Sequence, residues 1–544
     1  MANTTPQTQP LAGQVANSAG GYVYELDDAQ RLARFLVLGS EAGTYYTKPA
    51  QNQLENVAAL ERMVAAGRGV EAVEAVRALS LAGRAPKQTP TLHCLALCAR
   101  SADAETKAAA YAALSDICRI PTHLFEFLEC AENASGEATG WGRAHRRAVA
   151  GWYNGKGALG LAQAVTKYQQ RNGWAHLDAL RLCHAKPADA AHAAVFTYVV
   201  KGLAAAEEKA AQAEDQGEAE AVLAYLRAVE QMKRCTDAGE CAALIVDHRL
   251  AREHVPSSLL SSGPVWAALL QGMPLTALTR NLAKMTAVGL IAPGSEAAAL
   301  VCRRLGDAAA LRKARVHPFS VLLAHKTYAA GQGDKGSLTW QPAAEVVAAL
   351  DKAFQLAFVA VVPAGKRFLL ALDVSGSMGF YGMGGSAMGG GGSAMSCHEA
   401  AAAMALVTLE TEPCCEVMGF ADEFRALPLR KGMTLQACQR ATQGMSFGAT
   451  DCAKPMTWAM AQKKAFDVFV VYTDCETYHG SVHPSEALRQ YRRASGIADA
   501  RLVVVGMSSN GFSIADPADP FMMDVVGFDA ASPAVMADFA AGLI

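Results

Sequence analysis

Apolar residues recur three and four positions apart through the first part of the chain, as in the stretches that begin at Asn56 and Val222. This spacing places one apolar face along a helix. Glycine or proline interrupts the pattern at 67–69, 83–90, 121, 155–157, 187, 256, 274 and 318. We therefore predict about a dozen or more helices of ordinary length between residues 26 and 358. So many paired helices in succession indicate an α-solenoid.

The pattern changes after a last predicted helix at 343–361 and the break at Pro363-Ala-Gly365. Short apolar runs then alternate with amphipathic helices, which is typical of a parallel, doubly wound sheet. The predicted strands are 368–374, 415–420, 468–473, 502–506 and 525–528, and the helices between them include 399–409 and 484–493. We expect three parts: a leader at 1–20, a helical region at 21–362 and an α/β domain at 363–544.

Composition narrows the class of protein. The leader is polar, with no basic start followed by an apolar stretch, so we expect a disordered segment and not a signal peptide. No run of about 18 apolar residues predicts a membrane span. The 14 cysteines form no Cys-x-x-Cys pair, so we expect reduced thiols, a cytoplasmic location and no zinc site.

A net charge of −2 argues by itself against a nucleic-acid-binding protein, but the basic residues are unevenly distributed. Residues 138–186 contain eight lysines and arginines against one acid, Asp178. A nearly neutral protein with one cationic region is suited to hold a polyanion on one face. We predict that Lys167 and Arg171 lie four apart on a helix and meet one phosphate track. The alternative for any one of these residues is a solvated helix face.

A candidate metal site follows the first predicted strand of the α/β domain. Asp373, Ser375 and Ser377 are spaced by two, which can point their oxygens the same way. Thr450 follows a glycine-containing turn and Asp474 ends a later strand, so the three loops are expected to meet at one edge of the sheet. One carboxylate with hydroxyls suits a hard cation such as Mg²⁺. A turn cap is the alternative for the first motif alone.

Sequence patterns of common enzymes are absent. No Gly-x4-Gly-Lys-Ser/Thr loop, His-Glu-x-x-His or Gly-x-Ser-x-Gly with a credible base occurs. We therefore do not expect catalysis.

Several runs resemble the TROVE module of the Ro ribonucleoprotein family. They are Phe35-Leu-Val-Leu-Gly-Ser-Glu-Ala-Gly-Thr-Tyr-Tyr, Cys118-Arg-Ile-Pro-Thr-His-Leu-Phe, Trp152-Tyr-Asn, Ala164-Val-Thr-Lys-Tyr-Gln-Gln-Arg-Asn-Gly-Trp, Met273-Pro-Leu-Thr-Ala-Leu and Arg315-Val-His-Pro-Phe. The C-terminal part is similar to a von Willebrand A domain, at residues 446–456 and 508–517. The main departure from the family is a long Gly/Met/Ser-rich loop at 379–396.

The resemblance implies a ring of HEAT-like helical repeats that is closed by the A domain. It also implies that the protein is a monomer and binds Y-type small noncoding RNA on its outer surface. Ends of misfolded RNAs would enter the central hole, as part of noncoding-RNA quality control. A bacterial member would also have polynucleotide phosphorylase as a partner. The implied metal-ion-dependent adhesion site uses Asp373, Ser375, Ser377, Thr450 and Asp474. The predicted RNA contacts are Arg119, His123, Arg143, Arg146, Arg147, Lys156, Lys167, Arg171 and His184, of which His184 matches a family position.

Two other functions stay open at this point. In the first, the A domain is an adhesion-type module for an acidic protein partner and the helices are only a scaffold. In the second, the chain is a metal-dependent RNA-processing enzyme, which would cleave RNA when Mg²⁺ is present.

Overall fold

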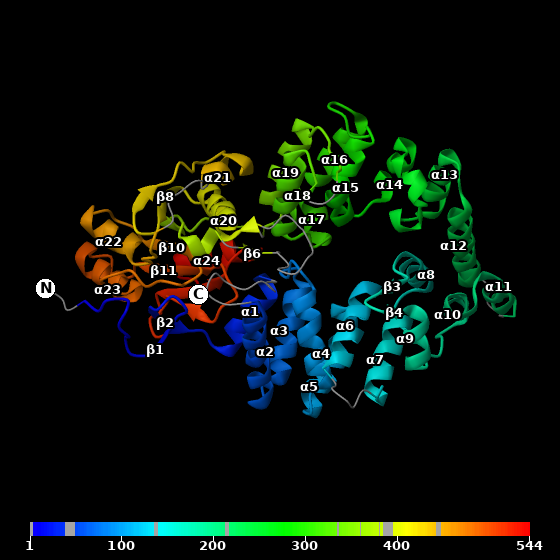
Figure 1. The fold of residues 1–544 in the computed structure, drawn as a ribbon, viewed down its shortest axis with the longest axis horizontal. Coiled ribbons are helices and arrows are strands. Elements are labelled where there is room, and N and C mark those ends of the chain that lie inside the picture. The colour runs from blue at the N-terminus through cyan, green and yellow to red at the C-terminus, as the bar shows by residue number, and fades with distance from the viewer. Residues whose placement is uncertain are drawn as a thin grey trace.

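The structure is a computed structural model that describes residues 4–38, 49–134, 140–212, 217–333, 337–358, 361–379, 381–383, 395–441 and 448–544. Helices of the first part form a curved row, and both ends of this row lie against an α/β domain (Figure 1). One apolar core runs from helix to helix along the row and continues into the sheet of the α/β domain. The predicted combination of a helical ring and a doubly wound α/β domain is confirmed.

The helices begin and end close to the predicted breaks. They are α1 (Asp28–Leu38), α2 (Pro49–Ala65), α3 (Gly69–Leu81), α4 (Thr89–Arg100), α5 (Ala104–Ile117), α6 (Pro121–Asn133), α7 (Arg143–Asn154), α8 (Ala158–Lys167), α9 (His176–Cys183), α10 (Ala190–Lys201), α11 (Leu203–Ala211), α12 (Gly217–Arg234), α13 (Ala238–His248), α14 (Gly263–Gly272), α15 (Leu275–Ala287), α16 (Glu296–Leu305), α17 (Ala308–Lys313), α18 (Pro318–Ala330) and α19 (Ala344–Leu356). Pro121 and Pro318 open helices because the fixed φ of proline suits the first helical position.

The two ends of the helical row also touch each other. Nε2 of His317, before α18, lies 3.1 Å from the carbonyl oxygen of Arg84, which follows α3. The Arg84 guanidinium in turn forms an ion pair with the buried carboxylate of Asp529 in the α/β domain. The ring is therefore closed by direct contact between the segments that flank α3 and α18, as well as by the α/β domain.

The α/β domain contains a six-stranded sheet in the order β13-β11-β10-β5-β8-β9. Its strands are β5 (Arg367–Asp373), β8 (Cys414–Phe420), β9 (Phe424–Ala426), β10 (Val468–Thr473), β11 (Arg501–Gly506) and β13 (Met522–Val526). All pair in parallel except β9, a short antiparallel edge strand that the sequence did not predict. The other five overlap the predicted strands.

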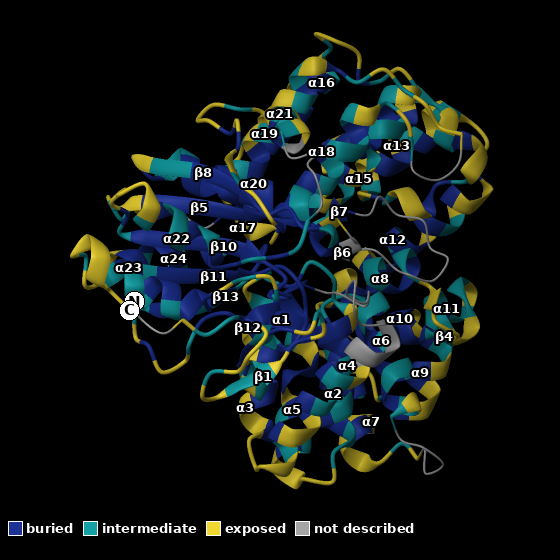
Figure 2. Ribbon diagram, turned by 60° about the vertical axis from the view of Figure 1, so that its left-hand side comes forward, coloured by how far each residue is buried: buried dark blue, intermediate teal, exposed yellow. Residues whose placement is uncertain are grey.

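Alternate residues of the central strands face two different layers of helices. Leu370 and Val470 join the core shared with α20 (Cys397–Thr411) and α24 (Ser532–Ala541). Leu369 and Val471 join the core shared with α22 (Lys454–Ala461) and α23 (Pro484–Ser495). The strands are consequently buried on both faces (Figure 2), as expected for a doubly wound sheet.

The prediction of a disordered leader is wrong for residues 4–20. Strands β1 (Gln14–Ala16) and β2 (Tyr22–Glu25) form a three-stranded sheet with β12 (Phe512–Ser513) of the α/β domain. We call residues 4–25 the N-terminal strap. The strap is polar because hydrogen bonds to distant loops hold it in place, so its sequence has no apolar pattern that would predict an ordered segment. Gln7 is completely buried among these loops.

The Gly/Met/Ser-rich loop begins and ends in a short antiparallel hairpin, β6 (Tyr381–Met383) and β7 (Met395–Ser396). This hairpin lies on the side of the α/β domain that faces the helical row (Figures 1 and 2). Residues 380 and 384–394 of the predicted loop are outside the described residues. In the part of the chain that is described, no helix is both long and apolar enough to cross a membrane.

Candidate nucleic-acid interface and metal centre

Three of the predicted RNA contacts line one surface pocket of about 490 Å³ between the start of α6 and one face of α8. These are Arg119, Lys156 and Lys167, which come from the α5–α6 connection, the α7–α8 connection and the last residue of α8. Gln163 and Tyr168 also line the pocket. The chain thus brings together cations that are up to 48 positions apart in the sequence.

Two of these cations are partly withdrawn from water, and neither forms an ion pair with a carboxylate of the described residues. The Arg119 guanidinium donates to the Ser80 hydroxyl (2.9 Å), and the Lys156 ammonium donates to the Arg119 carbonyl oxygen (3.1 Å). Burial and the nearby Arg315 lower the pKa of Arg119, and burial lowers the pKa of Lys156. An anion in the pocket would therefore be stabilised by both side chains.

The third cation, Lys167, has a weak acidic partner. Its ammonium lies 3.8 Å from the carboxylate of Glu253 and 4.9 Å from the centre of the Tyr168 ring. A cation above an aromatic ring is held in place without losing its charge. The aromatic face beside it is a surface on which a base could stack.

Arg171 does not lie on the same helix as Lys167, so that prediction is wrong. Helix α8 ends at Lys167, and Arg171 lies in the two-residue strand β3 (Gln170–Arg171), which pairs with β4 (Trp174–Ala175). Asn172 and Gly173 between them have φ values of 52° and 75°. Such an Asn-Gly turn is a strong hairpin signal that the sequence contained. The exposed Arg171 is only three residues beyond Tyr168 of the pocket.

The other exposed residues among the predicted RNA contacts form two groups. His184 caps α9 with left-handed backbone (φ 50°) and is exposed. The segment after it adjoins the loop that carries Lys156, because the Asn154 amide donates to the Lys186 carbonyl oxygen (2.8 Å). Arg143, Arg146 and Arg147 are exposed on the first turns of α7. Arg143 begins α7 and Lys156 lies two residues beyond its end, so the length of the helix, about 18 Å, separates them.

His123, in the first turn of α6, is partly buried and does not line the pocket. Burial, with a smaller contribution from Arg119, lowers its pKa to about 4. The imidazole is therefore neutral at physiological pH. Trp152 is fully buried, and Trp141 and Trp174 are partly buried against the same apolar core.

Internal ion pairs leave the cationic region almost untouched. Residues 138–186 contain eight lysines and arginines, and the structure describes all eight. Among the described residues, only Lys167 of these eight has an ion-pair partner.

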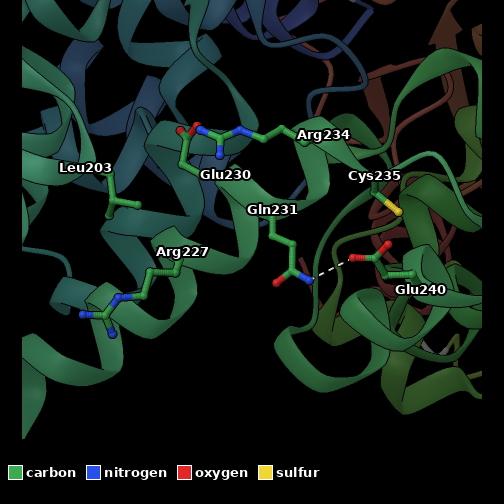
Figure 3. A pocket seen from close by; sticks show the side chains of 7 residues that line it. All are labelled: Leu203, Arg227, Glu230, Gln231, Arg234, Cys235 and Glu240. Carbon is green, nitrogen blue, oxygen red and sulfur yellow. Dashed lines mark hydrogen bonds between the residues drawn. The ribbon is translucent and has the colours of Figure 1, made fainter.

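A second hollow, of about 300 Å³ between α11, α12 and α13, is different (Figure 3). Its two arginines, Arg227 and Arg234, share the lining with Glu230 and Glu240. The first pocket is therefore the one whose lining is cationic without glutamates among its lining residues.

The predicted metal ligands lie at the carboxyl edge of the sheet. Asp373 ends β5, and its carboxylate accepts hydrogen bonds from the Ser375 backbone (2.9 Å) and the Thr473 hydroxyl (2.7 Å). The hydroxyls of Ser375 and Ser377 lie 3.1 Å apart. Asp474 follows the neighbouring strand β10. All four predicted ligands named here are buried.

Thr450, the fifth predicted ligand, is supplied by the loop that leads into α22. Its side chain is buried. Its carbonyl oxygen accepts from the backbone N–H groups of Tyr478 (3.1 Å) and His479 (3.0 Å), which lie in the loop after β10. The loops that carry Thr450 and Asp474 are therefore joined by backbone hydrogen bonds.

The electrostatics of this site favour a bound cation. Burial and repulsion from Asp474 raise the pKa of Asp373 to about 7, and burial also raises the pKa of Asp474. Two neighbouring buried carboxylates cannot both stay charged without a positive partner. Their carboxylate and hydroxyl oxygens form a donor set that suits Mg²⁺. Among the described residues, no cluster of three His, Cys, Asp or Glu side chains forms a different metal site.

Two supporting residues of this site were not predicted. The sequence predicts Thr473 only as the last residue of a strand, whereas in the structure its hydroxyl donates to the Asp373 carboxylate. His398, in the first turn of α20, lies with Nε2 3.1 Å from the Ser375 carbonyl oxygen. No sequence pattern indicated that α20 would begin beside the Asp-x-Ser-x-Ser loop.

Comparisons with known proteins cover both parts of the chain. The TROVE domain family model matches residues 15–327, and the Ro60 vWA domain model matches residues 367–540. The RNA-binding protein RO60 of Deinococcus radiodurans is 42% identical over 540 residues, which cover 99% of this chain and 97% of that protein. The RNA-binding protein RO60 of Caenorhabditis elegans is 35% identical over 593 residues, which cover 98% and 91%.

A solved structure is similar over nearly the same length. The crystal structure of the Deinococcus radiodurans RO (RSR) protein matches with a TM-score of 0.66 and 40% sequence identity, covering 95% of this chain and 100% of that chain.

Proposed function

The chain belongs to the Ro60 family of TROVE-domain proteins, and on this basis we propose that it binds structured RNA through the basic surface around α6, α7, α8 and α9. The supporting observation is the pocket in which Arg119, Lys156 and Lys167 converge. The first two are partly desolvated and pair with no carboxylate in the part of the chain that the structure describes, and the third has a carboxylate partner at 3.8 Å. Phosphate groups of RNA would supply the missing negative charge.

The finer proposal is that the RNA is a small noncoding RNA of the Y type. Its duplex would lie across the exposed cations, among them Arg171 and His184, and single-stranded ends of misfolded RNAs would enter the ring. Phosphate contacts, with stacking on residues such as Tyr168, give recognition of shape with little sequence code. In a bacterial cell, polynucleotide phosphorylase would be the partner that receives the RNA.

The test compares two variants with the same loss of charge. Lys167→Ala/Arg171→Ala removes one cation that lines the pocket and one from the β3–β4 hairpin that follows Tyr168, and Arg227→Ala/Arg234→Ala removes two from the hollow of Figure 3. Binding of a hairpin RNA with a single-stranded tail is measured by filter binding between about 50 and 200 mM KCl. The first variant should bind more weakly and flatten the salt slope by about 0.9 for each lost phosphate contact. An equal effect of both variants would exclude the pocket as the interface.

We also propose that the carboxyl edge of the sheet binds a divalent cation, with Mg²⁺ the preferred ion. Asp373, Ser375, Ser377, Thr450 and Asp474 would hold it. The bound ion would offer an open position to an acidic group of a partner protein or to an RNA phosphate. The support is the buried pair Asp373 and Asp474, whose pKa values are both raised.

Calorimetric titration of the full chain with Mg²⁺ tests the second proposal. The wild type should bind one ion and release protons below pH 7, because the Asp373 carboxyl, with a pKa of about 7, must lose its proton. Asp373→Ala should not bind. RNA affinity of this variant should be unchanged if the two sites are separate, and lost affinity would make the ion part of the RNA site. RNA cleavage by the purified chain in Mg²⁺ would instead favour a processing enzyme.

A further inference from the structure

A buried glutamine of the N-terminal strap joins two loops of the proposed metal site. The Gln7 side-chain amide donates to the Asp451 carboxylate (2.7 Å) and to the Val482 carbonyl oxygen (2.9 Å). Its side-chain oxygen accepts a hydrogen bond from the Thr477 hydroxyl. Asp451 directly follows Thr450, and Thr477 is three residues beyond Asp474. One side chain thus bridges the loops of two proposed ligands.

Thr477 extends this bridge to the backbone of the first loop. Its hydroxyl oxygen accepts from the Cys452 N–H (3.1 Å) and lies 3.2 Å from the Thr450 carbonyl oxygen. Gln7 therefore holds the Thr477 hydroxyl in the position from which it contacts Thr450 and Cys452, the two neighbours of Asp451.

A second strap residue holds the loop after Asp474. The Asn17 amide donates to the Thr477 carbonyl oxygen (2.8 Å), and the Glu476 carboxylate accepts from the backbone N–H groups of Ser18 (3.0 Å) and Ala19 (3.1 Å). Close approach of strap and loop requires glycine, since a Cβ atom on Gly21 would collide with the Thr477 carbonyl oxygen. The strap is thus packed into the loop that bears Asp474.

The proposed ligands differ in how the fold supports them. Asp373 and Asp474 adjoin hydrogen-bonded strands, whereas Thr450 lies in the described segment 448–451, which is neither helix nor strand. Outer groups that orient a metal ligand affect metal affinity nearly as strongly as the ligand itself. We propose that Gln7 is a positioning residue of the metal centre, which sets the distance of Thr450 from Asp474. This inference depends on the divalent-cation site proposed above.

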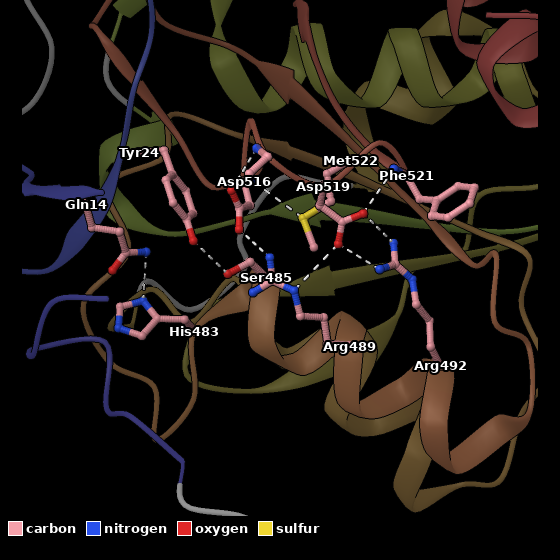
Figure 4. A network of polar contacts seen from close by, with 11 residues as sticks. Gln14, Tyr24, His483, Ser485, Arg489, Arg492, Asp516, Asp519, Phe521 and Met522 are labelled. Carbon is pink, nitrogen blue, oxygen red and sulfur yellow. Dashed lines mark hydrogen bonds and ion pairs between the residues drawn. The ribbon is translucent and has the colours of Figure 1, made fainter. Parts of the chain in front are cut away.

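The same strap also has anchors away from the metal loops, which supply a matched control. Figure 4 shows the Gln14 amide beside His483 and the Tyr24 hydroxyl beside Ser485, with separations of 3.3 Å in each case. These partners lie at the start of α23. Tyr24→Phe removes one strap contact with α23 and leaves the contacts of Gln7 unchanged.

The experiment titrates Mn²⁺ into the full chain and follows binding by electron paramagnetic resonance, with thermal unfolding of the metal-free proteins in parallel. Gln7→Ala should weaken Mn²⁺ binding by about tenfold or more, and Tyr24→Phe should bind as the wild type does. Should Gln7→Ala fail to fold, Asn17→Ala provides the same test on the Asp474 side.

Each of the remaining outcomes contradicts either the positioning role of Gln7 or the metal centre itself. Unchanged Mn²⁺ affinity in the folded Gln7→Ala and Asn17→Ala proteins, with a wild type that binds, overturns the positioning role alone. Equal weakening by Gln7→Ala and Tyr24→Phe also overturns it, because the strap would then act only through overall stability. A wild type that binds no Mn²⁺ overturns the metal centre itself and this inference with it.

Discussion

Arg34 belongs to α1, yet its guanidinium lies inside the α/β domain. Its side chain is 1% exposed, and the side chain of its partner, Asp524, is 8% exposed. Nη2 of Arg34 lies 2.5 Å from the Asp524 carboxylate. A second guanidinium nitrogen donates to the Phe512 carbonyl oxygen (2.9 Å). Burial raises the pKa of Asp524 even with Arg34 beside it. We predict that Arg34→Met leaves a buried carboxylate without a cation and lowers the free energy of unfolding by about 3–5 kcal/mol.

The size of this effect is checked against a similar pair at the surface. Arg367 and Asp467 also approach to 2.5 Å, but their side chains are 46% and 24% exposed. Arg367→Met should therefore cost no more than about 1 kcal/mol. Urea unfolding followed by circular dichroism measures both variants. Adding Asp524→Asn to Arg34→Met should recover much of the loss, because no buried charge then remains. Equal destabilisation by the two single variants would refute the reasoning.

Two further predictions concern stability. Burial lowers the pKa of His176 and His317 to about 4. Their contribution to the free energy of unfolding is therefore complete above about pH 6.5 and is lost as the pH falls toward 4. Urea unfolding at pH 5 should show a loss on the order of 1–2 kcal/mol per histidine, and an unfolding free energy that is constant from pH 7 to 5 would contradict this. Gly480→Ala should lower the free energy of unfolding by about 1–3 kcal/mol, since a Cβ atom there collides with the Gln7 amide. Gly151→Ala, with open space around it in α7, should instead raise it by about 0.5–1 kcal/mol; thermal unfolding distinguishes the two.

The sheet could be predicted closely because its strands are buried on both faces. Such strands are continuous apolar runs, as at β10, where every residue of Val468–Thr473 is buried. The edge strand β9 has three residues and none is fully buried, so it left no apolar run to detect. Helix boundaries were also predictable where glycine or proline marks them, as at Pro121.

The strap and the details of the pocket could not be predicted in the same way. Gln7 is buried by loops more than 440 positions away in the sequence, and a polar residue carries no local sign of such contacts. Arg119 and Lys167 line one pocket because the start of α6 and one face of α8 border the same hollow. The spacing of charges in the sequence showed that cations were abundant, but not which of them would share one pocket.

The central claim is that RNA lies on the basic surface beside α6 and α8. Cross-linking of a structured RNA that contains 4-thiouridine, followed by mass spectrometry of the attached peptides, tests it directly. We predict that Tyr168 and its neighbours around Lys156 and Lys167 carry the bound nucleotides. Cross-links confined to α11, α12 and α13, or to the α/β domain, would contradict the account.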